Sequence, residues 1–376
     1  MAVRRLLLLG IVMTEWKFDQ SPMVAIWEVT QACDLRCVHC RASAMPRRDP
    51  GELSRGEAVD LIDQLHELKP GVLVLTGGDP LKRPDLFTLI GTAVRRQLSV
   101  AITPSVTPLL TTSGIQRLAA AGVSRIALSL DGPDAATHDA FRGTPGAYAA
   151  TLEAIAAVRA AGVPLQINTS VSRRTVDSLA ATGRIVAEFA PALWSVFFVV
   201  PVGRAARDQQ LDAAICERLF NDLYEWRWAY GLPVKTTAAQ AFRRVALQRD
   251  MELRRAGQGR TQPRLHPAAV NDGKGFVFVS HTGEVYPSGF LPVSAGNVRQ
   301  TRLAAIYRSH PLFRALRTPN RLEGKCGRCE FRVQCGGSRA RAYAVTGNVF
   351  AEDPACEYQP PDPSSRADPI LGESRV

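Results

Sequence analysis

The 376-residue sequence predicts an α/β protein: a partial, open (β/α)6 barrel followed by a small cysteine-rich domain. Short apolar runs alternate with longer amphipathic stretches between residues 23 and 205, which is typical of a parallel sheet connected by right-handed helical crossovers. The alternation gives six strands, whereas a closed eight-stranded barrel typically needs about 250 residues. A second group of cysteines near the C-terminus indicates the additional domain.

Six strands are expected where apolar residues form short runs. They are Val24–Val29, Val72–Leu75, Val100–Thr103, Arg125–Leu130, Leu165–Val171 and Trp194–Val200. The intervening helices are expected at Ser54–Leu68, Pro84–Arg96, Thr112–Ala121, Pro145–Ala161 and Thr175–Ala190. The first of these helices begins with Ser-Arg-Gly-Glu, which is a capping box.

The remaining residues add helices to the barrel and form three further predicted domains. Residues 207–256 are expected to add helices to the barrel, and a hairpin is predicted at Phe276–Val279 and Glu284–Tyr286. The predicted domains are therefore an N-terminal extension (1–22), the barrel with added helices (23–256), the cysteine-rich domain (257–357) and a disordered tail (358–376). The tail is rich in Pro, Ser and Asp, a composition that does not support a packed core.

The composition is that of a soluble globular enzyme, with 46% hydrophobic and 22% charged residues. The net charge of +11 favours an acidic partner such as nucleic acid, an anionic membrane surface or a polyanionic small molecule. The Lys and Arg residues are nevertheless scattered, so this charge is also expected simply to solvate the surface. The longest apolar stretch, Leu6–Met13, is far shorter than the ~20 residues of a membrane-spanning helix.

The first residues imitate a signal peptide but lack an A-x-A-like cleavage site, so we expect a cytoplasmic protein with Met13 as an alternative start. Seven of the eight cysteines fall into two tight clusters. Such clustering in a cytoplasmic chain favours metal or redox chemistry over disulfides. Cys216 stands alone in a helical pattern and is predicted to be a packed core thiol.

The first cluster, C-x3-C-x2-C, comprises Cys33, Cys37 and Cys40 and directly follows the first predicted strand. Loops at the carboxyl ends of strands carry the chemistry of parallel α/β barrels. Three thiolates suit an iron–sulfur cluster with one iron left open for a substrate. The alternatives are a zinc site and incidental thiols. Zinc would need His39 as its fourth ligand, but this residue adjoins Cys40, and neighbouring side chains rarely converge on one ion.

With this motif the chain resembles the radical S-adenosylmethionine (SAM) enzymes, whose signature is C-x3-C-x2-C after the first strand of a partial (β/α)6 barrel. The resemblance covers residues 23–205 and implies that Cys33, Cys37 and Cys40 are the catalytic residues, because they hold a [4Fe-4S] cluster whose free iron is chelated by SAM. It also implies reductive cleavage of SAM to a 5′-deoxyadenosyl radical, which abstracts hydrogen from the substrate. His39 then becomes a packing residue beside the cluster.

Further positions match the places where the family contacts SAM or substrate. The turn Gly77-Gly78-Asp79-Pro80 resembles the family's G-G-E/D-P turn, whose backbone receives the SAM ammonium group, since glycine permits close approach. The other candidates that the resemblance implies are Ser105, Ser129, Asp131, Asn168, Arg173 and Val202. Each of them could instead be a turn former or a strand-end cap.

The second cluster reads C-x2-C-x5-C-x20-C and comprises Cys326, Cys329, Cys335 and Cys356. Four thiolates complete a closed site for zinc or for a fully ligated [4Fe-4S] cluster. The cluster resembles the SPASM extension of radical SAM enzymes, which holds two auxiliary clusters through seven cysteines. Serine replaces cysteine at Ser288 and Ser338, so we expect one auxiliary [4Fe-4S] cluster, as in the reduced "twitch" form, with an electron-transfer or structural role.

Three substrate classes remain open. The W-E-V-T-Q-A-C, G-G-D-P-L-K-R-P-D and C-G-G-S-R-A-R-A-Y segments most resemble family members that remove or oxidise porphyrin propionates in alternative haem and haem d1 synthesis. Ribosomal-peptide maturases, which form thioether or carbon–carbon bonds or epimerise residues, come second. They often carry an N-terminal peptide-binding domain, whereas only residues 1–22 precede the barrel here. Another small molecule comes third.

A zinc-stabilised nucleic-acid-binding protein is a distant alternative of another class. It should interleave aromatic and basic residues on one face, but aromatics make up only 7% of the chain and mostly lie in apolar runs. We therefore expect SAM, a porphyrin-like or peptide substrate and an electron donor of the flavodoxin or ferredoxin type as partners, with neither nucleic acid nor a membrane span.

Overall fold

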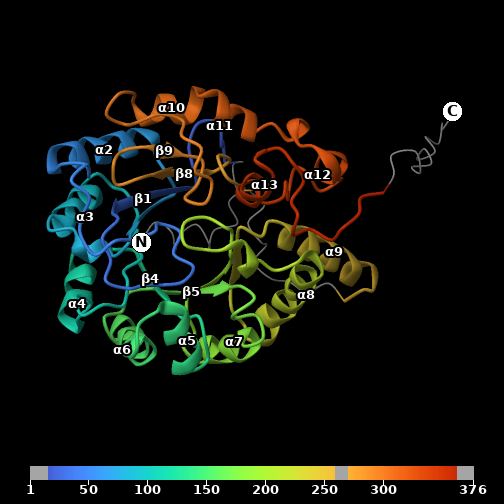
Figure 1. Cartoon of the computed structure of the whole chain (residues 1–376), viewed down its shortest axis with the longest axis horizontal. Coiled ribbons are helices and arrows are strands. Elements are labelled where there is room, and N and C mark those ends of the chain that lie inside the picture. The colour runs from blue at the N-terminus through green and yellow to red at the C-terminus, as the bar shows by residue number, and fades with distance from the viewer. Residues whose placement is uncertain (1–15, 259–269, 362–376) are drawn as a thin grey trace.

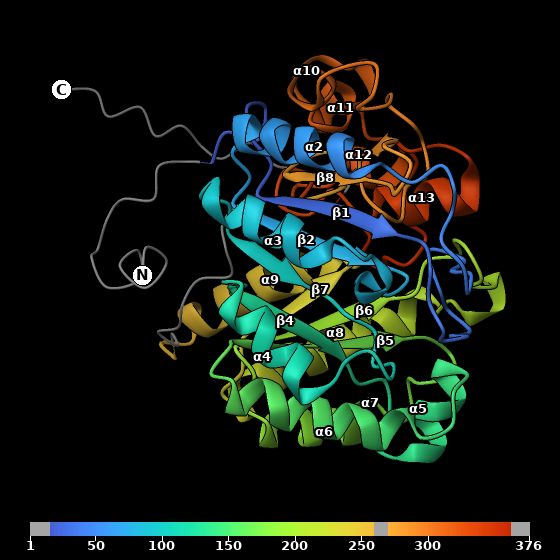
Figure 2. The same ribbon diagram turned by 90° about the vertical axis from the view of Figure 1, so that its left-hand side faces the viewer.

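The computed structural model describes residues 16–258 and 270–361. A nine-stranded sheet curls around the centre of the molecule, and helices cover its outer side (Figures 1 and 2). The strand order is β7-β6-β5-β4-β3-β2-β1-β8-β9, and all neighbours are parallel except the antiparallel pair β8 and β9. The predicted fold class, an open barrel of parallel strands, is confirmed.

The strands are β1 (Val24–Thr30), β2 (Val72–Gly77), β3 (Val100–Ile102), β4 (Arg125–Ser129), β5 (Leu165–Val171), β6 (Leu193–Phe198), β7 (Val234–Thr237), β8 (Phe276–Val279) and β9 (Val285–Tyr286). The helices of the barrel region are α2 (Arg55–Leu68), α3 (Leu86–Arg95), α4 (Thr112–Ala120), α5 (Ala135–Arg142), α6 (Ala147–Ala160), α7 (Leu179–Glu188), α8 (Ala213–Ala229) and α9 (Ala241–Arg255). The C-terminal helices are α10 (Leu303–Ser309), α11 (Pro311–Leu316), α12 (Gly324–Arg328) and α13 (Arg339–Thr346). Three short 3-10 helices are η1 (Pro80–Lys82), η2 (Arg207–Gln209) and η3 (Pro319–Arg321).

All six predicted strands and the five predicted barrel helices are present. The capping box of α2 forms as expected, with Ser54 N donating to Glu57 Oε2 at 2.7 Å and Glu57 N donating to Ser54 Oγ at 3.3 Å. The largest difference is in α7, which begins at Leu179 rather than at Thr175. Thr175 closes a turn instead, because its hydroxyl accepts from Ser172 N and donates to Ser170 O.

Two elements of the barrel region were not predicted, and neither were the C-terminal helices α10 to α13 or the three 3-10 helices. Strand β7 interrupts the region 207–256, which was expected to be helical, and pairs with β6 at the edge of the sheet. Its sequence, Val-Lys-Thr-Thr, has a single apolar residue and therefore forms no apolar run. Helix α5 has eight residues and follows Asp134, whose side chain caps it by accepting from Thr137 N.

The predicted hairpin forms, and it joins the barrel sheet. Strand β8 pairs in parallel with β1, on the side away from β2, so the sheet continues across the predicted domain boundary near residue 256. The domain boundaries themselves stay a prediction. Residues 1–15 of the N-terminal extension, residues 259–269 near the start of the cysteine-rich domain and residues 362–376 of the tail lie outside the described residues.

The core lies between the sheet and the outer helices. Alternate strand residues face it, among them Trp27 of β1, Ile126 of β4 and Trp194 of β6, because successive side chains of a strand point to opposite faces. Cys216 of α8 belongs to this core, and burial raises the pKa of its thiol to about 12. The prediction of a packed core thiol is confirmed.

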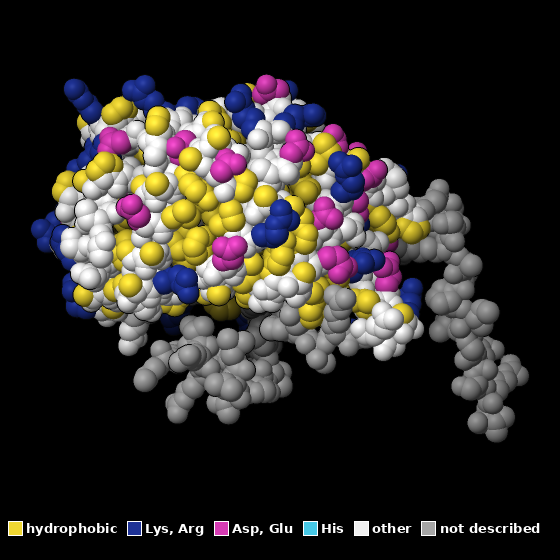
Figure 3. Space-filling view, turned by 90° about the horizontal axis from the view of Figure 1, so that it is seen from below, with side chains coloured by type: hydrophobic (Ala, Val, Ile, Leu, Met, Phe, Trp, Pro, Cys, Tyr) yellow, Lys and Arg dark blue, Asp and Glu magenta, His cyan; other side chains and the backbone are white. Residues whose placement is uncertain are grey.

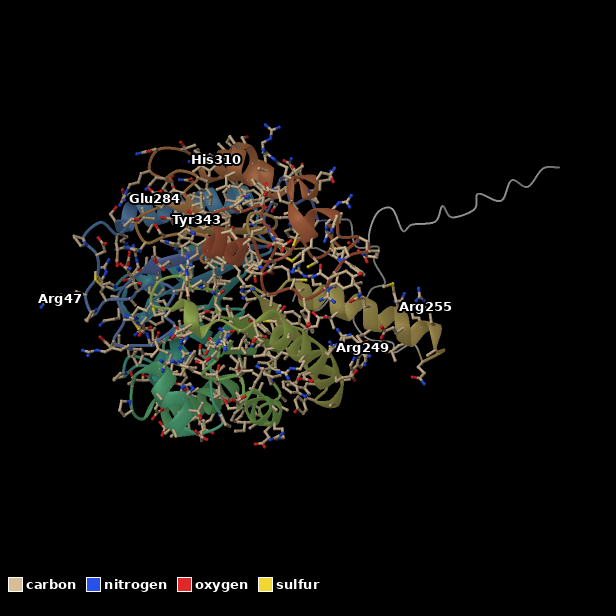
Figure 4. All side chains as sticks on the ribbon, turned by 45° about the vertical axis from the view of Figure 1, so that its right-hand side comes forward. Arg47, Arg249, Arg255, Glu284, His310 and Tyr343 are labelled. Carbon is tan, nitrogen blue, oxygen red and sulfur yellow. The ribbon has the colours of Figure 1, made fainter. Side chains whose placement is uncertain are left out.

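One face of the molecule shows how its surface charge is distributed. On the face shown in Figure 3, Lys and Arg side chains stand apart from one another, with Asp and Glu between them. Figure 4 shows Arg249 and Arg255 on α9, on the opposite side of the view from Arg47. None of the helices in the described parts of the chain combines the length and hydrophobicity needed to cross a bilayer.

Candidate functional site

A cavity of about 210 Å³ lies at the carboxyl ends of the strands. The predicted site residues that line it are Cys33, Cys37, Cys40, Gly77, Gly78, Ser105, Ser129 and Asn168. All but Asn168, which lies in the middle of β5, follow or end one of the strands β1 to β4, and the carboxyl ends of parallel strands meet at one edge of the sheet. The structure thus brings together residues that are up to 135 positions apart in the sequence, from Cys33 to Asn168.

The loop that carries the first three cysteines is held from two sides. Arg204, after β6, donates from Nε to Cys37 O at 3.1 Å and from Nη1 to Ala44 O at 2.9 Å. At its other side, Val38 N donates to Phe141 O of α5 at 3.1 Å. These contacts fix the loop through its backbone, which leaves the cysteine side chains to line the cavity.

Each of the three sulfur atoms accepts an N–H group. Leu35 N lies 3.4 Å from Cys33 Sγ, Ala44 N lies 3.5 Å from Cys40 Sγ, and Arg142 Nη1 lies 3.8 Å from Cys37 Sγ. Such donors stabilise thiolate ligands of iron–sulfur clusters. Three soft, N–H-bonded sulfurs beside an open cavity fit a [4Fe-4S] cluster with one iron free of protein ligands.

No three or more His, Cys, Asp or Glu side chains converge on the position of a single metal ion in the described chain. The ligands of a four-iron cluster bind different irons and need not converge on one point. His39 stacks on Phe141, with ring centroids 4.0 Å apart and planes at 10°. Burial lowers its pKa to about 3, so it is a neutral packing residue, as expected.

The glycine turn after β2 approaches the cysteine loop closely. A Cβ atom at Gly77 would lie 2.4 Å from Thr30 O, and one at Gly78 would lie 2.5 Å from both Gln31 O and Ala32 O. Ser105 Oγ donates to Gly78 O at 2.8 Å. Only glycine permits this approach, which places the turn's backbone in the cavity lining.

Asp79 and Pro80 lie behind this turn rather than in the cavity lining. Asp79 is fully buried, and its carboxylate accepts from Thr107 Oγ1 at 2.7 Å and from Leu81 N at 3.1 Å. Pro80 begins η1. Burial raises the pKa of Asp79. The two hydrogen bonds hold its carboxylate in place and thereby fix the turn.

Asp131 is also buried behind the cavity, where it positions Arg142. Its carboxylate lies 2.6 Å from Arg142 Nη2 and accepts from Ser170 N at 2.6 Å. Burial alone would raise the pKa of Asp131, but Arg142, His39 and His138 hold it below its usual value. Arg142 lines the cavity and reaches Cys37. Arg142 was not predicted as a site residue because α5 was not predicted. The Asp-Gly-Pro-Asp turn before this helix was the available signal for a helix start.

Arg173 and Val202 are not in the cavity lining. The side chain of Arg173 is 57% exposed, and its Nε donates to Gln210 O at 2.8 Å. Val202 packs in a small apolar cluster with Val200. The segment after β6 contributes Val199 and Val200 to the cavity instead.

The second cysteine cluster gathers around a separate cavity of about 20 Å³, lined by Cys326, Cys329, Cys335 and Cys356. Asp353 N and Gly337 N lie 3.4 Å from Cys326 Sγ and Cys335 Sγ. Burial raises the pKa of Cys335 to about 12 and that of Cys329 to about 11. Thiols this basic lose their protons when a metal centre compensates the buried negative charge, so the donor set fits a closed metal cluster.

The two serines at positions where the seven-cysteine pattern has ligands are buried. Ser338 caps α13, its hydroxyl accepting from Arg341 N at 3.2 Å. Ser288 Oγ accepts from Phe290 N at 3.3 Å and also lowers the pKa of Asp272, which burial raises. The chain's own hydrogen bonds therefore engage both hydroxyls.

Comparison with protein families matches residues 27–178 to the radical SAM superfamily and residues 271–330 to the SPASM iron–sulfur cluster-binding domain. The chain is 41% identical over 350 residues to the AdoMet-dependent heme synthase of Nitratidesulfovibrio vulgaris, covering 91% of this chain and 94% of that protein. It is 38% identical to the AdoMet-dependent heme synthase of Methanosarcina barkeri, covering 90% and 97%.

Other relatives are less similar in sequence. A mycofactocin maturase of Mycobacterium tuberculosis is 30% identical, covering 89% of this chain and 83% of that one. The fold is similar to that of Streptococcus suis SuiB bound to S-adenosylmethionine, with a TM-score of 0.70 at 15% identity, covering 90% of this chain and 78% of SuiB. The chain therefore belongs to the radical SAM superfamily: it is an enzyme that uses S-adenosylmethionine, a [4Fe-4S] cluster that binds it and an auxiliary iron–sulfur centre in a SPASM domain.

Proposed function

We propose that this radical SAM enzyme abstracts hydrogen from a propionate side chain of a porphyrin. The observation that carries the proposal is the similarity to two AdoMet-dependent heme synthases, at 41% and 38% identity over nine-tenths of the chain. The maturase similarity is weaker, at 30%, so a peptide substrate is not favoured.

Cys33, Cys37 and Cys40 are proposed to hold the cluster, with its free iron facing the cavity. When bound, the cluster and SAM supply a 5′-deoxyadenosyl radical that takes a hydrogen atom from the substrate. Arg142 supports the cluster ligand Cys37, to which it donates. Its pKa is raised by Asp131 and Cys37 although burial opposes this, so it stays positively charged beside a thiolate.

Backbone groups of Gly77 and Gly78, together with Ser105, Ser129 and Asn168, are proposed to bind SAM. All five line the cavity, and their carbonyl, hydroxyl and amide groups suit the ammonium, carboxylate and ribose groups of SAM. Apolar residues that also line the cavity, including Val199 and Val200, exclude water from this space.

The four C-terminal cysteines are proposed to hold one auxiliary [4Fe-4S] cluster. Four thiolates leave its irons no open position for a substrate, which favours electron transfer or a structural role. A flavodoxin- or ferredoxin-type protein is the proposed electron donor.

The substrate proposal can be tested with a porphyrin that carries deuterium in its propionate side chains. Reduced, anaerobically reconstituted enzyme with SAM should transfer deuterium into 5′-deoxyadenosine, because the radical takes the hydrogen directly. A variant with Cys33, Cys37 and Cys40 all changed to Ala is the control and should form no 5′-deoxyadenosine. Absence of transfer from the porphyrin, with transfer from a labelled peptide, would show that the enzyme is a peptide maturase.

A further inference from the structure

The inner face of the sheet carries polar side chains that continue from the cavity toward the amino-terminal ends of the strands. Ile126, Ile167, Trp194 and Val234 of β4 to β7 pack in the core on the outer face. The residues next to them along each strand therefore point into the barrel, where Figure 2 shows these strands inside the helical layer. Those inward residues are Arg125, Gln166, Ser195 and Lys235.

Strand register connects this inner surface to the cavity. Ser129 pairs with Asn168, Asn168 with Ser195, and Ser195 with Lys235. Ser129 and Asn168 line the cavity, so one row of residues leads from the cavity to Lys235. A second connection runs along β5, where Gln166 Nε2 donates to Asn168 Oδ1 at 2.7 Å.

Ser195 lies in this row without a hydrogen-bond partner. Its side chain is completely buried, and its Oγ contacts no donor or acceptor in the described chain. A buried hydroxyl in this state costs about 1–3 kcal/mol, and exceptions of this kind in a folded protein call for a specific explanation. A hydrogen bond between the Ser195 hydroxyl and a group bound next to Lys235 would explain this burial.

Positive charges converge at the end of the row. Burial lowers the pKa of Lys235 to about 8, and the positive charges of Arg125 of β4 and Arg243 of α9 contribute to this shift. The hydrogen bonds of both arginines are to neutral groups: Arg125 donates to Gln166 Oε1 and Arg243 to Gln334 O, each at 3.4 Å. None of these three cations forms an ion pair with any carboxylate of the described residues. Burial lowers the pKa of Arg243, and the nearby Cys335 thiolate raises it. Like charges gathered in a partly buried place are stabilised by a bound anion.

We propose that Arg125, Lys235 and Arg243, with the Ser195 hydroxyl, form a binding subsite for a carboxylate of the substrate that does not react. This inference rests on the proposed function, because a porphyrin with several propionates can present one to the cavity and another to the subsite. Arg125 is four residues from Ser129, about 13 Å along an extended strand. Guanidinium and ammonium groups are the side chains that bind carboxylates most strongly.

The first experiment measures porphyrin binding to the reconstituted enzyme with SAM, by anaerobic absorbance titration. Lys235→Met and Arg125→Met should each raise the Kd for a propionate-bearing iron porphyrin at least about tenfold, because each removes a charged hydrogen bond. Lys235→Arg should restore most of the affinity. The controls Lys17→Met and Arg159→Met change exposed cations away from the barrel interior and should leave the Kd unchanged.

A second porphyrin separates a charge effect from a folding defect. The methyl ester of the same porphyrin has no free carboxylate, so wild-type enzyme and Lys235→Met should bind it equally. If Lys235→Met binds the acid as tightly as wild type does, or loses as much affinity for the ester as for the acid, the subsite assignment is wrong.

A third measurement needs no porphyrin. Acetylation of Lys235 at about pH 8, near its pKa, is followed by peptide mass spectrometry with glutarate, a dicarboxylate, or with its neutral diamide. Glutarate should suppress labelling of Lys235 but not of Lys17, and the diamide should suppress neither. If Lys235 is labelled equally in the presence of glutarate and of the diamide, the anion subsite is wrong, whatever the substrate is. Protection of Lys235 by glutarate without deuterium transfer from the porphyrin overturns the proposed function alone.

Discussion

The side chains that surround Cys37 show how individual residues place a positive charge beside a buried sulfur atom. Arg142 donates to Cys37 Sγ at 3.8 Å and pairs with Asp131 at 2.6 Å. Asp131 in turn accepts from Ser170 N. This chain of contacts keeps a cation beside the sulfur in a buried place, where a charge without a partner would be costly.

Gly78 offers a prediction at the scale of a single residue. Gly78→Ala would place a methyl group 2.5 Å from two backbone carbonyl oxygens of the cysteine loop, and overpacking of this kind costs about 1–3 kcal/mol. We expect the loop or the turn to move and SAM binding to weaken at least about tenfold, which is 1.4 kcal/mol, as measured by equilibrium dialysis.

The matched control is Gly56→Ala. A Cβ there meets nothing within 4 Å, and Gly56 lies in the first turn of α2. SAM affinity should not change in this variant. Wild-type affinity in Gly78→Ala would mean that the glycine turn does not shape the SAM site.

Helix α2 connects the barrel to the C-terminal part of the chain. Gln64 Oε1 accepts from Leu303 N of α10 at 2.7 Å, and Glu57 pairs with Arg299 at 2.6 Å. The side chain of Glu57 therefore serves both the capping box and this ion pair, and these contacts together lower its pKa to about 2. The start of α2 is consequently a point where local helix stability and domain packing depend on each other.

Ser54→Ala should therefore lower the free energy of unfolding by about 1 kcal/mol, the usual cost of losing an N-cap. Ser178 is the matched control, since it precedes α7 but its side chain makes no capping hydrogen bond. Urea denaturation of the two variants should show a clearly larger effect for Ser54→Ala. Equal effects would mean that the capping box contributes little.

For the whole molecule, the β1–β8 pairing brings three distant segments together. Glu28 of β1 is buried, lies 2.7 Å from Arg41 of the cysteine loop and also lies 2.7 Å from His281 Nδ1, just after β8. Burial would raise the pKa of Glu28, but Arg41 and His281 lower it. The cysteine loop and the C-terminal hairpin thus share one buried carboxylate.

This network predicts a pH dependence. Burial opposes protonation of His281, but Glu28 and Asp49 raise its pKa above 6.5. A raised folded-state pKa gives stability that is fully present below about pH 6.5 and is lost as the pH rises through the folded-state value. The difference in unfolding free energy between wild type and His281→Gln should therefore shrink from pH 6 to pH 8. A constant difference would show that folding does not shift the pKa of His281.

The auxiliary site gives a second prediction for the whole molecule. Changing Cys326 and Cys329 together to Ser should lower the iron content by about four atoms per chain, as expected for one four-iron cluster. Some SAM cleavage should remain, since the two cysteine sites line separate cavities. Cys216→Ala, in the core, should leave the iron content unchanged. Unchanged iron in the double variant would mean that these cysteines bind zinc or no metal.

The sequence by itself determined the open parallel barrel, the six first strands and both cysteine clusters, because these depend on local patterns: apolar alternation, capping residues and close spacing of cysteines. It also indicated the Gly77-Gly78 turn through its position after β2. Strand β7 and helix α5 were not predicted, because Val-Lys-Thr-Thr has a single apolar residue and a helix of eight residues shows only about two turns of periodicity.

Only the tertiary structure decided which residues meet. It joined β8 to β1, placed Arg142 and Arg204 on the cysteine loop, put Asp79 and Asp131 behind the cavity and left Arg173 outside it. It also gathered Arg125, Lys235 and Arg243, which lie on separate elements. The physical reason is that strand curvature and register set such contacts, and both depend on packing between segments that are far apart in the chain.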